Sequence, residues 1–178
     1  MIQDQLNISG EKIEELQNLA SQNLFMHAQQ INDWAGNLKI FVKGEGVWVI
    51  DVNGHKYLDS MGGLWFKSAG YGREEIAKAI YEQACAIETP PANGACIPQI
   101  ELAGKIAKLY PDKNARSFFT SGGSESVETA VKMAKKYQMN QGKSGAYKVI
   151  SRRYSYHGST AMAVSLGKPL TSDTMGPE

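Results

Sequence analysis

Apolar residues recur every three or four positions in four stretches of the chain, which predicts four amphipathic helices. The first stripe contains Ile13, Leu16, Ala20 and Leu24, and Ser9 stands before it where an N-cap is expected. The other stretches lie at residues 73–87, at 98–109 and, after a Gly/Ser turn, up to residue 137; prolines at 90, 91 and 111 end the middle two. We expect the first helix to lie against another part of the protein.

A pattern typical of strands covers residues 41–59. The apolar run Val47–Ile50 precedes Asn53-Gly54, a dipeptide that predicts a type I′ hairpin turn, and Lys56–Leu58 would form the partner strand. A glycine-rich loop with aromatic residues then follows at Met61–Tyr71.

Two further short apolar stretches, Arg116–Thr120 and Tyr147–Ser151, flank the fourth helix and predict strands. Strand, helix and strand in this order form a βαβ unit, in which the two strands are parallel. We therefore expect an α/β fold with a mostly parallel sheet. The loops after the two strands would lie side by side at the carboxyl edge of that sheet, where ligands gather.

The first of these loops has the composition of a phosphate-binding turn. Gly122 and Gly123 allow a tight turn and a close approach to a ligand, and serines at 121, 124 and 126 add hydroxyls beside the free N–H groups of the helix start. The loop lacks the Gly-Lys-Ser/Thr of a Walker motif and the spacing of a dinucleotide fingerprint. It also lacks the last glycine of a hydrolase nucleophile elbow. Considered alone, it could still be an ordinary βα connection.

Composition narrows the possible classes of function. The 178 residues carry a net charge of +1 and are 42% hydrophobic, which is typical of a globular domain. Basic and acidic residues are interleaved, so we expect no nucleic-acid partner. No apolar run has the length of a membrane span, and the first residues do not resemble a signal peptide. We expect a cytoplasmic protein without a metal site, in which Cys85 and Cys96 are buried thiols.

The second loop, Arg152–Thr160, places an aromatic ring at the same edge of the predicted sheet. Tyr156 could stack on a flat ligand, and such stacking contributes about 0.5–1.5 kcal/mol beyond the area it buries. A planar heteroaromatic ring that carries a phosphate is pyridoxal phosphate. The alternative for Tyr156 is a tyrosine of the core.

Four motifs together resemble a known family. They are Gly63-Leu64-Trp65, Gly70-Tyr71-Gly72, the run SGGSESVETA from Ser121, and Tyr156-His157-Gly158-Ser159-Thr160. Their order and spacing are similar to those of the class III, or omega, aminotransferases, which belong to the fold type I pyridoxal phosphate enzymes. The resemblance covers about residues 24–168, and within the family it is closest to the taurine:pyruvate and beta-alanine:pyruvate type.

The resemblance implies a role for each motif. The implied cofactor-binding residues are Ser121, Gly122, Gly123, Ser124, Tyr156, His157 and Gly158. Tyr156 would stack on the pyridine ring, and His157 with Gly158 would shape its loop. Trp65 would form a wall of the substrate pocket, although a core or dimer-interface tryptophan is the alternative. Small residues around Asn93, where relatives that act on aromatic amines carry aromatic residues, favour a small polar amino donor.

Transamination also needs a lysine that holds the cofactor as a Schiff base and a carboxylate on the pyridinium nitrogen. The family places both beyond the Tyr-His-Gly loop, so we assign no catalytic residue in this chain. The stretch Lys168–Glu178 is loop-like and leaves the predicted sheet narrow. We therefore expect the amino-terminal part of a longer, homodimeric enzyme: an arm and hairpin at 1–70 and the first part of the large cofactor-binding domain at 71–178.

The expected activity is transfer of an amino group from a small omega-amino donor to a keto acid, with pyruvate as the expected acceptor. Because the Schiff-base lysine is expected elsewhere, we predict that this chain is inactive alone. The alternative is a non-catalytic chain that acts as an interaction or dimerisation module.

Overall fold

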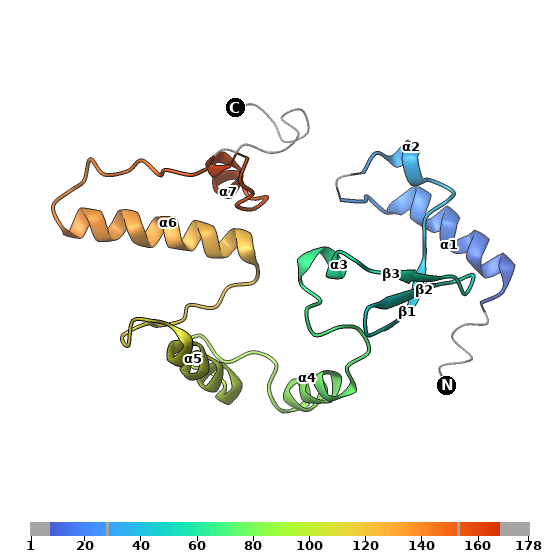
Figure 1. Cartoon of the computed structure of the whole chain (residues 1–178), viewed down its shortest axis with the longest axis horizontal. Coiled ribbons are helices and arrows are strands. Elements are labelled where there is room, and N and C mark those ends of the chain that lie inside the picture. Colours follow the sequence, from blue (N-terminus) through green and yellow to red (C-terminus); the bar gives the residue numbers. More distant parts are fainter. Residues whose placement is uncertain (1–7, 28, 153, 168–178) are drawn as a thin grey trace. The chain divides into compact units, whose positions relative to one another are not determined.

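The computed structural model describes residues 8–27, 29–152 and 154–167, so the expectation for Lys168–Glu178 lies outside the described residues. The chain divides into two units, Met1–Asn93 and Gly94–Glu178, and each is described by itself. The first unit contains α1 (Gly10–Asn23), α2 (Ile31–Trp34), β1 (Phe41–Glu45), β2 (Trp48–Asp51), β3 (Lys56–Leu58), α3 (Gly62–Trp65) and α4 (Glu74–Ala86) (Figure 1). The second contains α5 (Ile97–Leu109), α6 (Gly123–Asn140) and α7 (Ala161–Leu166).

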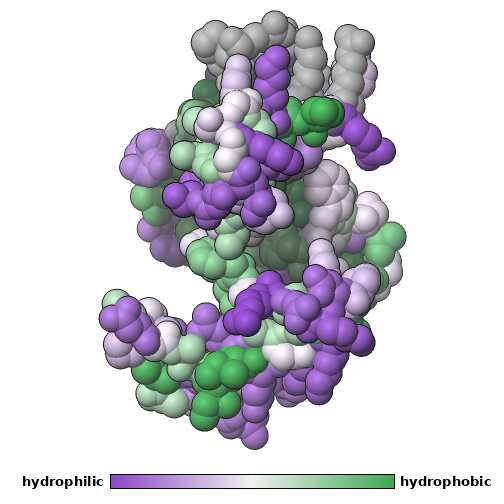
Figure 2. Space-filling view, turned by 90° about the vertical axis from the view of Figure 1, so that its left-hand side faces the viewer, coloured by the Kyte–Doolittle hydropathy of each residue, from purple (hydrophilic) through white to green (hydrophobic). Residues whose placement is uncertain are grey.

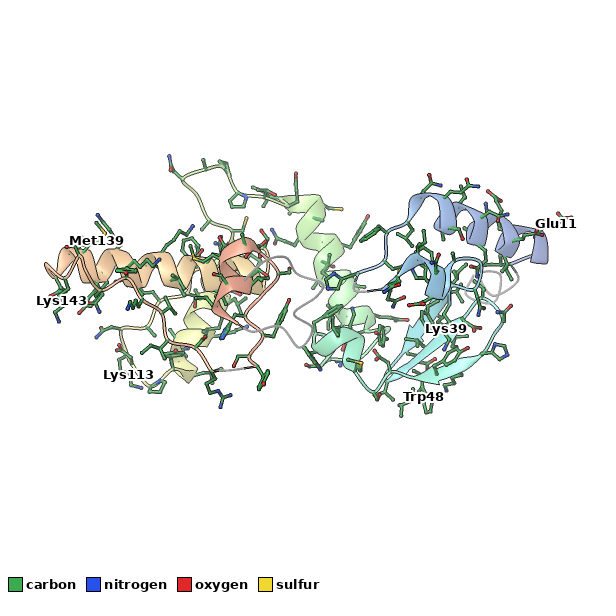
Figure 3. The ribbon with its side chains drawn as sticks, turned by 90° about the horizontal axis from the view of Figure 1, so that it is seen from above. Glu11, Lys39, Trp48, Lys113, Met139 and Lys143 are labelled. Carbon is green, nitrogen blue, oxygen red and sulfur yellow. The ribbon has the colours of Figure 1, made fainter. Side chains whose placement is uncertain are left out.

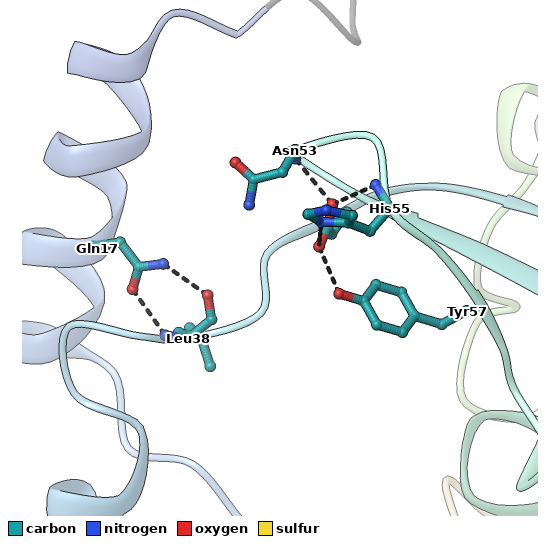
Figure 4. Close-up of polar contacts among 6 residues, drawn as sticks. Gln17, Leu38, Asn53, His55 and Tyr57 are labelled. Carbon is teal, nitrogen blue, oxygen red and sulfur yellow. Dashed lines mark hydrogen bonds and ion pairs between the residues drawn. The ribbon is translucent and has the colours of Figure 1, made fainter.

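Helix α1 begins and docks as its sequence predicts. The Ser9 hydroxyl accepts a hydrogen bond from the backbone N–H of Lys12 at 3.3 Å, which caps the helix. Further along, the side-chain amide of Gln17 forms two hydrogen bonds with the backbone of Leu38, donating at 2.7 Å and accepting at 2.9 Å (Figure 4). The helix therefore lies against the segment that leads into β1.

The predicted strands at 41–59 form a three-stranded antiparallel sheet in the order β1-β2-β3. The predicted type I′ turn is wrong. That turn requires positive φ at both Asn53 and Gly54, but only Gly54 has it, with φ +81°. Instead, the buried Asp51 carboxylate accepts hydrogen bonds from the backbone N–H groups of Asn53 and His55, both at 2.9 Å, and closes a longer loop (Figure 4).

The two predicted parallel strands are not formed within the described residues. Residues 116–120 and 147–151 surround α6 as expected, but they carry no strand hydrogen bonds, and the only sheet in the described part of the chain is the antiparallel one. A strand exists only when a neighbouring strand accepts and donates its backbone hydrogen bonds. The helix between these segments did not depend on such partners, because its hydrogen bonds are internal.

Helix α6 ends in a glycine cap. Gly142 has φ +73°, and the N–H groups of Gly142 and Lys143 donate to the carbonyls of Met139 and Gln138 at 3.0 and 2.9 Å. This is the Schellman arrangement, which satisfies the last carbonyl groups of a helix. Met139 and Lys143 mark this end of the helix in Figure 3.

Few side chains of the described residues are buried. The buried apolar residues are Trp34, Val52, Val131 and Ala163. Helices α4 and α5 have no buried residue, and Figure 2 shows strongly apolar side chains at the surface. The expectation of two buried thiols is therefore wrong, since Cys85 on α4 is exposed and Cys96 is half-buried. No helix in the described ranges is both long and apolar enough to cross a membrane.

Candidate functional site

The start of α6 is built around the carbonyl of Gly122. The hydroxyls of Thr120 and Ser126 both donate to this carbonyl at 3.0 Å, and they also lie 2.5 Å from each other. No side chain of the described residues caps the first N–H groups of α6. The turn is thus fixed by two hydroxyls, while the N–H groups at the positive end of an 18-residue helix stay available.

The two glycines of this turn do not adopt a backbone conformation that requires glycine. Gly122 is extended, with φ −165°, and Gly123 is not among the residues with positive φ. The predicted need for glycine to make the turn is therefore not observed. A Cβ placed on Gly123 would meet no protein atom within 4 Å. The position next to the first residue of α6 is therefore open.

The second loop docks onto this helix start, as the sequence predicts. The backbone N–H of Ser159 donates to the Ser124 hydroxyl at 3.0 Å. Gly158 is buried and has φ +137°, and a Cβ there would lie 2.5 Å from the Ser124 oxygen and 2.8 Å from the Cβ of Ala163. Only glycine fits this contact. The loop after residue 152 and the loop after residue 120 therefore meet although their predicted strands do not pair.

Two buried polar atoms in the described part of the second loop have no hydrogen-bond partner there. His157 Nε2 and Thr160 Oγ1 are buried and have no hydrogen-bond partner among the described residues. The Ser124 oxygen accepts from Ser159, but a hydroxyl also has one hydrogen to donate, and that hydrogen remains available. Buried polar atoms without partners are uncommon, and a ligand or ordered water usually satisfies them.

Tyr156 has the exposure that a stacking residue needs. Its side chain is 68% exposed, so a core position is not observed within the described residues. It lines a small hollow with His157, Gly158 and Val164. Two residues before it, Tyr154 has φ +61°, a left-handed conformation that is unfavourable for a residue with a side chain. Such strain is concentrated at functional loops.

Trp65 lies in the first unit, at the end of the short helix α3. Residues 62–65 all have positive φ, from +55° to +73°, so α3 is a left-handed turn. Asp59 holds this turn: its carboxylate accepts hydrogen bonds from Gly63 N–H at 2.6 Å and from the Tyr71 hydroxyl at 2.7 Å. The hydrogen bond from the Tyr71 hydroxyl lowers the pKa of Asp59 most, and the hydrogen bonds from the backbone N–H groups of Gly63 and Met61 lower it as well. Trp65 is 74% exposed.

A family model for class III aminotransferases matches residues 31–177. The chain belongs to the class III aminotransferase family. It is 43% identical over 157 residues to a probable aminotransferase of Mycobacterium tuberculosis, covering 87% of this chain and 34% of that protein. It is also 40% identical over 147 residues to a putrescine–pyruvate aminotransferase of Pseudomonas aeruginosa, covering 80% of this chain and 31% of that protein.

Among solved structures, the chain resembles an (S)-enantioselective omega-transaminase from Thermomicrobium roseum with a TM-score of 0.86 and 34% identity over 97% of this chain and 39% of that one. The chain thus spans about a third of the length of the curated relatives it matches, at 34% and 31%. The fold is that of part of a fold type I pyridoxal phosphate enzyme. Class III aminotransferases use this cofactor, and a matching omega transaminase from Pseudomonas jessenii was solved in complex with PMP.

The residues at the start of α6 fit the phosphate group of this cofactor. A dianion would meet uncapped N–H groups, the open space at Gly123 and the free hydrogen of Ser124. Glu125 carries an opposing charge nearby, and its carboxylate oxygen lies 2.9 Å from where a Cβ of Gly122 would be. Its side chain is exposed and can turn away into solvent.

Sequence reasoning missed several residues that shape these sites. Thr120 is predicted only as the end of a strand. A hydroxyl next to a Gly/Ser turn, however, often forms a hydrogen bond that stabilises the turn. Ser159 and Thr160 were part of a motif but received no role. Asp59 also received none, although an aspartate directly before a glycine-rich loop often binds the backbone N–H groups that follow.

Proposed function

We propose that this chain provides the phosphate-binding part of a pyridoxal phosphate site in an aminotransferase that acts on small omega-amino donors and pyruvate. The observation that carries the proposal is the hydrogen bond from Ser159 to Ser124, because it brings the helix start and the Tyr156 loop together. Bound pyridoxal phosphate supplies the ring that accepts electrons during amino transfer. The residues of this chain hold its phosphate and cover one face of its ring.

We assign roles to the site residues on this basis. Gly122, Gly123 and the N–H groups behind them accept the phosphate, and the hydroxyls of Ser121 and Ser124 donate to it. Tyr156 stacks on the ring, and His157 with Gly158 keeps the loop in place. Lysines at 132, 135 and 136 lie nine or more residues into α6, which is about 14 Å or more from the helix start at 1.5 Å per residue. We propose that the lysine that binds the cofactor covalently is not among the residues of this chain.

Relatives and the sequence both support the proposed amino donor and keto acceptor. One relative is named for putrescine and pyruvate and another for beta-alanine and pyruvate, so pyruvate is shared while the donor varies. The segment around Asn93 carries small residues, which favours small polar donors such as beta-alanine or taurine over benzylic amines. We further propose a cytoplasmic homodimer, and light scattering of the purified protein would show the assembly.

The decisive experiment compares the binding of pyridoxal phosphate and of pyridoxal to the purified protein, by change in melting temperature and by fluorescence titration. Pyridoxal phosphate should stabilise the protein and pyridoxal should not, because only the former has the phosphate. Ser124→Ala should weaken binding by about tenfold, since a hydrogen bond to a charged group contributes about 1.5 kcal/mol or more. Equal effects of the two compounds would refute the site.

A matched control removes a hydroxyl that lies outside the site. Ser165 is exposed on α7 and donates to the carbonyl of Met162 in its own helix at 2.7 Å. Ser165→Ala should leave pyridoxal phosphate binding unchanged. If Ser124→Ala and Ser165→Ala weaken binding equally, the effect comes from the stability of the unit and not from the phosphate contact.

The exposed apolar faces of α4 and α5 support a second proposal, that of an interaction or dimerisation module. This reading predicts self-association without any response to pyridoxal phosphate. The comparison of the two compounds therefore separates the two functions.

A further inference from the structure

The turn that carries Trp65 has an unusual backbone. Leu64 and Trp65 have φ values of +67° and +73°, and they continue the positive φ of Gly62 and Gly63. Two hydrogen bonds of helical spacing close the turn, from Trp65 N–H to the Met61 carbonyl at 2.8 Å and from Phe66 N–H to the Gly62 carbonyl at 3.1 Å. Consecutive left-handed residues with side chains are unfavourable, so this turn requires an external support.

Asp59 provides that support. In addition to Gly63 and Tyr71, its carboxylate accepts a hydrogen bond from the Met61 N–H at 3.2 Å. The backbone N–H of Asp59 donates to the Val47 carbonyl at 2.9 Å, which ties the residue to the sheet. Asp59 thus connects the sheet, the first half of the turn and the Gly-Tyr-Gly motif.

Tyr71 is itself fixed by the sheet. Its backbone exchanges two hydrogen bonds with Gly46, at 2.8 and 3.0 Å. Its ring lies so close to Gly44 that a Cβ there would be 2.6 Å from the Cβ and Cγ of Tyr71. The hydroxyl that reaches Asp59 therefore comes from an immobilised ring, and the position of the carboxylate is set by the sheet.

The side chain of Trp65, by contrast, has little packing of its own. It is 74% exposed, and the neighbouring Phe66 is 72% exposed. The backbone of the turn therefore sets the direction of its Cα–Cβ bond, and few contacts of the ring add to this. If the turn relaxed to right-handed φ values, the Cα–Cβ bonds of Leu64 and Trp65 would point elsewhere.

We infer that Asp59 is a positioning residue that holds residues 62–65 in the left-handed turn and so fixes the direction of Trp65. The consequence for function rests on the proposed function: by fixing the direction of Trp65, Asp59 would affect the choice between small and bulky amino donors. The backbone part of the inference does not depend on any activity.

The first experiment measures the order of Trp65 directly. The chain has three tryptophans, so the near-ultraviolet circular dichroism of Trp65 is obtained by subtracting the spectrum of a Trp65→Phe partner from that of each variant. Asp59→Asn should lose most of the Trp65 signal while its far-ultraviolet spectrum stays native. Asp59→Asn combined with Leu64→Gly should regain much of it, because glycine adopts positive φ readily.

A matched control tests whether any lost aspartate has this effect. Asp112 also accepts a backbone N–H two residues later, from Asn114 at 2.8 Å, in a turn of the second unit. Asp112→Asn should leave the Trp65 signal unchanged. A folded Asp59→Asn protein with an unchanged Trp65 signal would overturn the inference.

If Asp59→Asn does not fold, Tyr71→Phe tests the inference instead. This substitution removes the hydrogen bond from the Tyr71 hydroxyl but keeps the hydrogen bonds of the Asp59 carboxylate with the N–H groups of Met61 and Gly63. A reduced Trp65 signal in folded Tyr71→Phe supports positioning. An unchanged signal would show that Asp59 serves stability alone, and the inference would fail.

The donor consequence is tested in an enzyme form that also contains the lysine that binds the cofactor, with beta-alanine and a benzylic amine as amino donors and pyruvate as acceptor. Asp59→Asn should change the ratio of the two kcat/KM values by about tenfold, with unchanged affinity for pyridoxal phosphate. Absence of transamination in that lysine-containing form would refute the proposed function, while the dichroism would still decide the positioning. Wild-type transamination with an unchanged ratio in Asp59→Asn would refute the donor role alone.

Discussion

Replacing Gly158 by alanine should separate the two loops of the cofactor site. The new Cβ would lie 2.5 Å from the Ser124 oxygen, 2.8 Å from the Ala163 Cβ and 2.9 Å from the Ser124 Cα. Two of these neighbours are rigid, because one belongs to the backbone and the other is a Cβ. The loop must therefore move away from α6, which breaks the hydrogen bond between Ser159 and Ser124.

The size of the effect follows from two terms. Overpacking of a buried site destabilises by about 1–3 kcal/mol. A side chain at φ +137° adds strain of about 1–3 kcal/mol. If the substitution destabilises the docked loop by about 3 kcal/mol, the equilibrium shifts toward the undocked loop by a factor on the order of 100. Because the contact is local, the first unit should keep its stability.

Hydrogen exchange measured by mass spectrometry is the suitable assay. Peptides that cover residues 155–166 should lose protection in Gly158→Ala, and peptides of the sheet should not. Gly104→Ala is the matched control, since Gly104 is exposed within α5 and a Cβ there meets no atom within 4 Å. Alanine in an exposed helix stabilises it by about 0.5–1 kcal/mol. Equal protection of residues 155–166 in the two variants would refute the close contact at Gly158.

Three shorter predictions concern the first unit. Ser9→Ala should destabilise α1 by about 1 kcal/mol through loss of the N-cap, measured by denaturant unfolding; no change would show that the cap is dispensable. Trp65→Ala in the holoenzyme should change the preference between amino donors more than the affinity for pyridoxal phosphate, and an unaltered donor profile would contradict the proposed pocket wall. Burial raises the pKa of Asp51, but the hydrogen bonds from His55, Tyr57 and Asn53 lower it by more than burial raises it, so the pKa in the folded protein lies below the ordinary value. Its stabilising effect is therefore complete above the unfolded pKa of about 3.9 and is lost as the pH falls through the lower folded value. The denaturation midpoints of wild type and Asp51→Asn should converge on acidification. A difference that stays constant with pH would show that the charge of Asp51 does not stabilise the fold.

Local patterns in the sequence were sufficient for the helices and their ends. The Ser9 cap and the start and end of α6 are formed by residues that are neighbours in the sequence, so a few consecutive positions are enough to predict these helix ends. The class III aminotransferase family was also evident from motifs whose order the chain preserves. The roles of individual site residues, Trp65 and Tyr156 among them, stay predictions until they are tested.

The backbone at two turns depended on side-chain hydrogen bonds that the turn motifs do not reveal. The Asp51 carboxylate accepts from the N–H groups two and four residues later, and the tight turn that Asn53-Gly54 predicts is not formed. Asp59 and Tyr71, 12 residues apart, support a left-handed turn that no local preference favours. Likewise, residues 116–120 have the composition of a strand but no neighbouring strand among the described residues. The sequence alone determined the elements whose hydrogen bonds are internal. Strand pairing and the contact between Asp59 and Tyr71 required the tertiary structure, because their hydrogen bonds join segments that are separate in the sequence until the chain folds.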